Sequence, residues 1–154
     1  MMIWLQRNAW WLLLTMTVLV AVLGLWPLAM GIKEDASVPL GITGLTASQL
    51  EEASAQGYRL LDFEARGGGI SLIVIGTLLS AIVLGAFREN RRWAWGAMWV
   101  LPVWGASVFV LILVGGVAPG QAPPTPMISG PVIAVLSSAL LAISAPRFVG
   151  HQLP

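Results

Sequence analysis

The sequence predicts an all-α integral membrane protein. We expect a bundle of four transmembrane helices that forms one membrane domain over residues 1–154, with a short extracytoplasmic amphipathic helix between the first and second spans. The composition is 57% hydrophobic and only 10% charged, and the mean hydropathy of +0.84 lies far outside the averages of soluble domains. Four apolar runs also have the length of roughly 20 residues that crosses a bilayer core as a helix.

The four predicted spans cover residues 9–30, 68–87, 94–117 and 127–145, and none of them contains an ionisable side chain. The first run follows Arg7 and could instead be a cleaved signal peptide. Its length of about 22 residues exceeds the roughly 7 to 15 residues of a signal-peptide core, which favours a retained helix.

Basic residues beside the spans predict the orientation, because they accumulate on the cytoplasmic side of a membrane. One side of the predicted bundle carries Arg7, Arg88, Arg91, Arg92 and Arg147. The other side carries three basic residues and a larger number of carboxylates, all within residues 31–67. We therefore expect both termini and the turn at residues 88–92 to be cytoplasmic.

The predicted outer loop, residues 31–67, contains helix punctuation. Thr46 and Gln49 have the spacing of a capping box, which predicts a helix from Ala47 to about residue 56, and Gly57 is the predicted stop. Residues 58–66 are then expected to form a further amphipathic turn or two, with Asp62 close enough to Arg59 or Arg66 to pair on one helix face. This segment could lie on the membrane surface or serve as a solvated connector.

The segment "RGGGIS", residues 66–71, lies at the predicted start of the second span. It lacks the spaced glycines and the lysine of a phosphate-binding loop. We interpret it as a flexible helix start, where exposed amides and the Arg66 guanidinium could hold a lipid phosphate.

Prolines and small residues refine the predicted packing. Residues 118–126 should form a stiff outer turn, and Pro131 suits the first turn of the fourth helix. Pro102 cannot donate to the carbonyl of Met98, so a kink is expected there in the third helix. Two pairs of small residues at spacing four in the second span, Gly76 with Ser80 and Ala81 with Gly85, predict close helix packing.

Residues that could support catalysis or metal binding are scarce. The chain has no cysteine, and its single histidine, His151, has no second ligand at suitable spacing. Its serines have no neighbouring base and no nucleophile-elbow pattern. We therefore predict no catalytic, cofactor-binding or metal-binding residue, no cofactor and no enzymatic activity.

The segment "FRENRRWAWGAMW", residues 87–99, combines three arginines with three tryptophans. Because an apolar span lies on each side of it, the segment is expected to be a short hairpin at the membrane surface, which excludes binding to nucleic acid. The residues predicted to anchor the chain in the lipid interface are Arg88, Arg91, Arg92, Trp93 and Trp95. The residues predicted as possible ligand or partner contacts are Met98, Trp99, Trp104 and Arg66.

The layout of residues 43–104 resembles a family of uncharacterised small bacterial membrane proteins with four helices. The likeness rests on the outer helix opened by "GLT", the glycine-bearing start of the next span, and the arginine-rich turn that leads into "RWAW". It implies this fold and a location in the bacterial inner membrane, and it implies no activity.

Two functions agree with these patterns. The first is that of a non-catalytic structural or accessory subunit, which packs against lipids and other membrane-protein subunits or associates with itself. The second is that of a binder or carrier for a small apolar ligand, such as a quinone, a lipid or a pigment, held between the helices near Trp99 and Trp104. The absence of charge within the spans favours the first function.

Overall fold

The computed structural model of the chain describes residues 2–33, 35–115 and 125–149, and every regular element in these ranges is a helix. Four helical segments are long and apolar enough to cross a membrane: Asn8–Lys33, Ala55–Phe87, Arg92–Gly115 and Met127–Ser144. The predicted all-α fold with four membrane-length helices is therefore confirmed. His151 and most of the predicted proline-rich turn lie outside the described residues.

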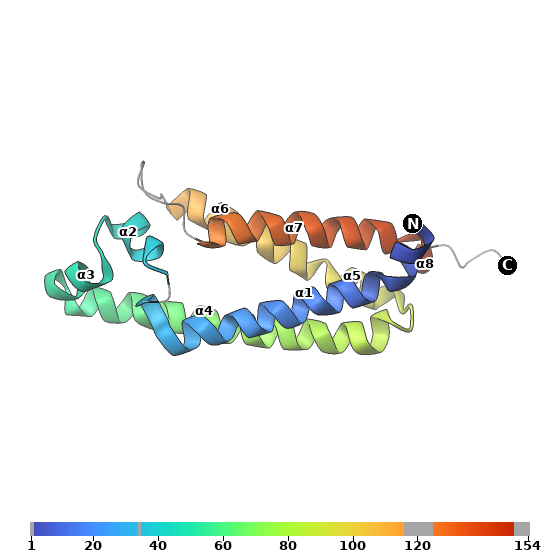
Figure 1. The fold of residues 1–154 in the computed structure, drawn as a ribbon, viewed down its shortest axis with the longest axis horizontal. Coiled ribbons are helices and arrows are strands. Elements are labelled where there is room, and N and C mark those ends of the chain that lie inside the picture. The colour runs from blue at the N-terminus through green and yellow to red at the C-terminus, as the bar shows by residue number, and fades with distance from the viewer. Residues whose placement is uncertain (1, 34, 116–124, 150–154) are drawn as a thin grey trace.

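The first helical hairpin consists of α1 (Met2–Met30) and α4 (Ala55–Ile82), which lie side by side along most of their length (Figure 1). Glycines allow this close approach. A Cβ atom on Gly24 would lie 2.6 Å from the carbonyl oxygen of Gly69, and one on Gly76 would lie 2.5 Å from the amide of Ala21. The predicted packing through Gly76 is thus confirmed, whereas a Cβ atom on Gly85 would meet nothing within 4 Å.

The second hairpin pairs α6 (Val100–Gly115) with α7 (Thr125–Ser144), and α5 (Arg92–Met98) precedes it. Its closest contact is again between glycines, because a Cβ atom on Gly105 would lie 2.7 Å from the carbonyl oxygen of Gly130. The two hairpins meet mainly where α1 packs against α7.

The predicted break near Pro102 is present, since a turn at Trp99 separates α5 from α6. The Trp99 amide bonds to the carbonyl of Gly96, three residues earlier, before normal helical bonding resumes with Val103. The prediction for Pro131 was wrong. α7 begins at Thr125, so Pro131 lies inside the helix and Pro126 occupies the first turn, where an amide is not required.

The connection between the first two spans holds three short helices: η1 (Gly31–Lys33), α2 (Ser37–Thr43) and α3 (Ala47–Ala53). The predicted capping box of Thr46 and Gln49 opens α3. Helix α2 was not predicted from the sequence.

The predicted stop at Gly57 was wrong. Ser54 ends α3 and caps α4, its hydroxyl accepting from the Gly57 amide at 3.1 Å, so Gly57 lies in the first turn of α4. The glycines of "RGGGIS" consequently lie in the middle of α4 and do not form a flexible helix start. One of them, Gly69, instead provides the close contact with α1.

The bundle has two different ends (Figure 1). At the first, which we call the turn end, α4 continues into a π-helical turn, η2 (Val83–Phe87). α1 and α5 both pack against η2, and α5 also packs against α8 (Pro146–Val149). Most of the buried core lies here: Leu13, Val83, Phe87, Ala94, Met98, Leu101, Leu141 and Phe148. At the other, which we call the loop end, α3 packs against α4, α2 packs against α3, and the hairpins diverge (Figure 1).

Candidate functional site

An interhelical cavity of about 210 Å³ lies between the two hairpins, on the loop-end side of the core. All four membrane-length helices, the segment before α2 and α2 itself contribute to it. Its lining residues are Val20, Leu23, Asp35, Val38, Leu72, Trp104, Val108, Ser129, Gly130 and Ile133.

The walls of the interhelical cavity differ in polarity along its length. Val20, Trp104 and Ile133 line the part nearer the turn end, because each lies further along its helix in that direction than the other lining residues of the same helix. Asp35 and Ser129 bring polar groups to the part nearer the loop end. The Asp35 carboxylate also accepts from the amide and the hydroxyl of Ser37, at the start of α2. The cavity is therefore apolar inside and polar at one end.

A second space, which we call the tryptophan groove, is a shallow open depression of about 330 Å³ on the outer face of α5 and α6. Its lining residues are Gly96, Trp99, Val100, Val103 and Trp104. Val103 is 61% exposed, and a Cβ atom on Gly96 would meet nothing within 4 Å. The floor of the groove is thus accessible to a neighbouring molecule in the membrane.

The predicted contact residues separate in the structure. Trp99 lines only the groove, whereas Trp104 lines both the groove and the interhelical cavity. Met98 is fully buried in the core behind the groove. Arg66 lies on α4 near the loop end, whereas the other three residues belong to the α5–α6 segment. The four predicted residues therefore do not form one site.

Two of the predicted interface anchors bond within the bundle. The indole nitrogen of Trp95 donates to the carbonyl of Leu141 at 3.0 Å, and Nε of Arg92 donates to the carbonyl of Phe148 at 3.0 Å. Both bonds connect α5 to the end of the fourth span. They hold the start of the third span against the end of the fourth at the turn end.

The other predicted anchors lie on the surface. Trp93 is 61% exposed, and the Arg91 guanidinium pairs with Glu89 at 3.3 Å. The Arg88 guanidinium lies 5.2 Å from the ring centre of Trp10, in cation-π contact with α1. Anchoring in the lipid interface remains a prediction for these residues.

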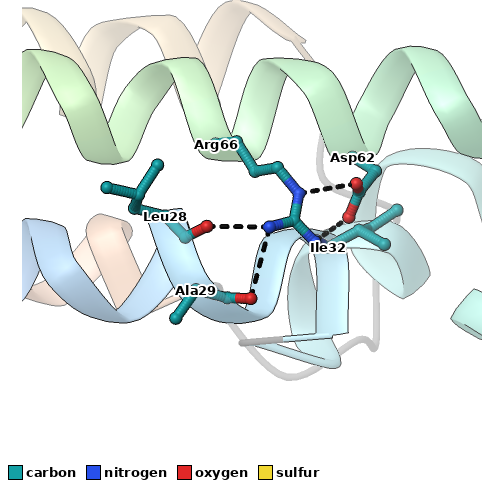
Figure 2. A network of polar contacts seen from close by, with 5 residues as sticks. All are labelled: Leu28, Ala29, Ile32, Asp62 and Arg66. Carbon is teal, nitrogen blue, oxygen red and sulfur yellow. Dashed lines mark hydrogen bonds and ion pairs between the residues drawn. The ribbon is translucent and has the colours of Figure 1, made fainter.

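Arg66 forms a polar network with α1 that we call the loop-end clamp (Figure 2). Its Nη1 donates to the carbonyls of Leu28 at 2.8 Å and Ala29 at 3.2 Å, and its Nε donates to Asp62 at 2.8 Å. Asp62 also accepts from the amide of Ile32 at 3.0 Å. The clamp therefore satisfies backbone groups where α1 ends.

Asp62 precedes the uncharged part of α4 that begins at Gly68, and its partners favour the ionised form. Its hydrogen bonds with Arg66 and with the Ile32 amide lower the pKa of the Asp62 carboxyl below its ordinary value. Asp62 pairs with Arg66 rather than with Arg59, the other predicted partner. Since at least two nitrogens of Arg66 bind within the protein, its side chain stabilises the fold whether or not it also contacts a lipid.

The described part of the chain contains no group of three histidine, cysteine or carboxylate side chains arranged to hold a metal ion. Comparison with known proteins adds no functional residue, since no protein-family model, no curated protein and no solved structure matches the chain. The resemblance to a family of uncharacterised bacterial proteins therefore remains a prediction.

Most residues of the interhelical cavity could not be identified from the sequence. Leu72, Val108 and Ile133 are aliphatic residues in apolar spans, and nothing in the pattern distinguishes them from lipid-facing neighbours. Trp104 is the one cavity residue that the sequence singled out as a possible contact.

Proposed function

We propose that the protein is a non-catalytic accessory subunit whose tryptophan groove binds a transmembrane helix of another membrane-protein subunit. The observation that carries this proposal is the open groove between Trp99 and Trp104 on the outer face of an apolar, membrane-length helical segment. We further propose that the protein lies in the bacterial inner membrane with both termini cytoplasmic, as the distribution of arginines predicts.

The shape of the groove suits a helix. Gly96, Val100 and Val103 follow one another at spacings of four and three, so they lie on one face of the α5–α6 segment and form the floor of the groove. Small and β-branched side chains allow a second backbone to come close, which is what stabilises helix pairs in lipid. The two indoles on either side supply large apolar contacts of the kind that dominate protein interfaces.

The groove is also fixed in shape. Trp99 stacks edge to face with Trp95 at a ring-centre distance of 5.8 Å, and Trp95 in turn bonds to α7. Met98 and Leu101 fill the core directly behind. A surface that does not reorganise loses less entropy when it binds a partner.

The test is site-specific photocrosslinking in the native membrane. A photoreactive amino acid replaces Val103 in the groove or, as the matched control, Val135, which is 67% exposed on α7 outside the groove. We expect a crosslink to a different polypeptide to be the main product at position 103 and a minor one at position 135.

Equal products at the two positions would contradict a specific partner. A crosslinked product that contains only two copies of this chain would show that the groove mediates self-association, and it would contradict the accessory role.

The second function predicted from the sequence, binding of a quinone, lipid or pigment, is supported by the interhelical cavity. Pockets for drug-sized molecules usually occupy roughly 300–1,000 Å³. At about 210 Å³ the cavity is smaller than that, which favours a flexible chain over a fused ring system.

A further inference from the structure

We propose that the interhelical cavity holds one hydrocarbon chain of a membrane phospholipid, with the lipid headgroup at the loop end. The second chain of the same lipid stays in the bilayer. This proposal deepens the ligand-binding function and does not depend on a partner helix in the tryptophan groove.

The volume of the cavity fits a single chain. An engineered apolar cavity of about 150 Å³ is sufficient to bind benzene. The interhelical cavity, at about 210 Å³, is larger than that and smaller than a typical pocket for a drug-sized ligand. A segment of one acyl chain fills such a space, whereas two chains side by side do not.

The polarity of the walls sets the direction of the chain. Leucine, valine, isoleucine and tryptophan side chains surround the inner part, where a hydrocarbon tail loses nothing by leaving the bilayer. Asp35 and Ser129 lie at the loop end, where polar groups of a headgroup region can approach them. An amphiphile therefore fits in one orientation only, with its tail toward the turn end.

The bundle offers a lateral route from the bilayer. Among the described residues, α1 packs on α4, α6 packs on α7, and α1 packs on α7, but α4 and α6 do not form a packed pair. Leu72 of α4 and Val108 of α6 line the cavity from these two helices. A chain that enters between α4 and α6 keeps its glycerol backbone and its second chain outside the protein.

Each hairpin is a closely packed pair of helices. Glycine contacts fix α1 against α4 and α6 against α7, so the helices cannot slide freely within each hairpin. An empty apolar cavity loses contacts on every wall, and an apolar chain restores them. Supply is not limiting, because acyl chains are the solvent of the membrane.

The experiment fills the cavity from the protein side and counts the lipids that remain bound. Val108→Trp places an indole in the cavity, and Val110→Trp places the same indole on α6 at a site that is 54% exposed and outside the cavity. Each protein is reconstituted in vesicles of phosphatidylethanolamine and phosphatidylglycerol, extracted in a mild detergent and weighed by native mass spectrometry.

We expect the unmodified protein and Val110→Trp to retain about one phospholipid per chain. Val108→Trp should retain about tenfold less, which corresponds to a loss of about 1.4 kcal/mol in binding free energy. The mass of the adduct identifies its source. Equal retention by all three proteins, or adducts of free fatty acid or detergent alone, would overturn the proposal.

Two controls keep the result interpretable. Ile133→Phe also fills part of the cavity, with a ring smaller than the indole of Val108→Trp, and should likewise reduce the amount of phospholipid retained. This second variant tests the proposal if Val108→Trp does not fold. Crosslinking from Val103 should be unchanged in Ile133→Phe, because position 133 does not line the groove. If Ile133→Phe loses its phospholipid but still gives the Val103 crosslink, the lipid site and the partner-binding groove are independent of each other.

Discussion

The turn end and the loop end of the bundle differ in how closely the two hairpins pack against each other. At the turn end, the hairpins share a filled core in which the rings of Phe87 and Phe148 lie 4.8 Å apart. At the loop end, α1 and α4 remain joined by the clamp of Asp62 and Arg66, but a cavity separates them from α6 and α7. One end is closed by side chains and the other leaves room for a ligand.

This difference indicates where binding to each class of molecule is favourable. The tryptophan groove lies over the filled core, so its residues are held in place before a partner arrives. The interhelical cavity is bounded by both hairpins, so a change in their separation changes its width. A rigid surface suits a protein helix, and an adaptable space suits a lipid.

The largest expected effect comes from removing a side chain of the turn-end core. Phe87→Ala should lower the free energy of unfolding by about 3–5 kcal/mol, because Phe87 is fully buried and its removal leaves a void. Val108→Ala, in the cavity wall, should cost only about 1 kcal/mol, because it removes two carbon atoms from a partly buried side chain. Unfolding in mixed micelles with increasing denaturing detergent measures both variants. Similar losses for the two would remove the distinction between the ends.

A smaller effect is expected from the loop-end clamp. Asp62→Asn should cost about 1–3 kcal/mol, because it removes the charge that faces Arg66 and weakens the bond from the Ile32 amide. Glu64→Gln, an exposed carboxylate two residues away, serves as the control and should change stability by less than about 0.5 kcal/mol.

The Asp62 contribution also predicts a pH dependence. Because folding lowers the pKa of Asp62, its stabilisation is fully present above the ordinary value of 3.8 and is lost as the pH falls through the lowered pKa. The stability difference between the unmodified protein and Asp62→Asn should be constant from pH 7 to pH 5 and should shrink only in stronger acid. A difference that already shrinks near pH 6 would contradict this assignment.

The smallest effect concerns the turn-end hydrogen bonds. Trp95→Phe keeps an aromatic ring and removes the donor to the Leu141 carbonyl, which should cost about 1 kcal/mol. Trp93→Phe, at an exposed position, should be nearly neutral by the same unfolding measurement. If Trp93 proves the more important of the two, the indole at position 95 does not hold the third span against the fourth.

The sequence predicts well the features that depend on local chemistry. Thr46 and Gln49 identify the start of α3 because a capping box lies within a few residues of chain. Pro102 predicts the interruption at Trp99 because a missing amide acts four residues away. The four spans follow from length and hydropathy alone.

Features that depend on contacts distant in the chain were missed. Gly57 is an exception, since it depends on a local contact and was still misread: the Ser54 hydroxyl, three residues earlier, caps α4 and makes Gly57 part of its first turn. Gly69 resembles a flexible hinge, although it lies in the helix interior against Gly24, where only glycine fits. The interhelical cavity is invisible in the sequence because it arises from the angle between two hairpins, and no single residue encodes that angle.

The most direct test of the difference between the two ends is a pair of distance measurements by double electron–electron resonance. Because the chain has no cysteine, spin labels can be placed at will. The exposed positions Leu25 and Leu113 report across the loop end, and Leu12 and Val100 report across the turn end. We predict that removal of lipid shifts or broadens the distance distribution of the loop-end pair and leaves that of the turn-end pair unchanged. Equal changes in both pairs, or none in the loop-end pair, would contradict a bundle that is closed at one end and holds a lipid chain at the other.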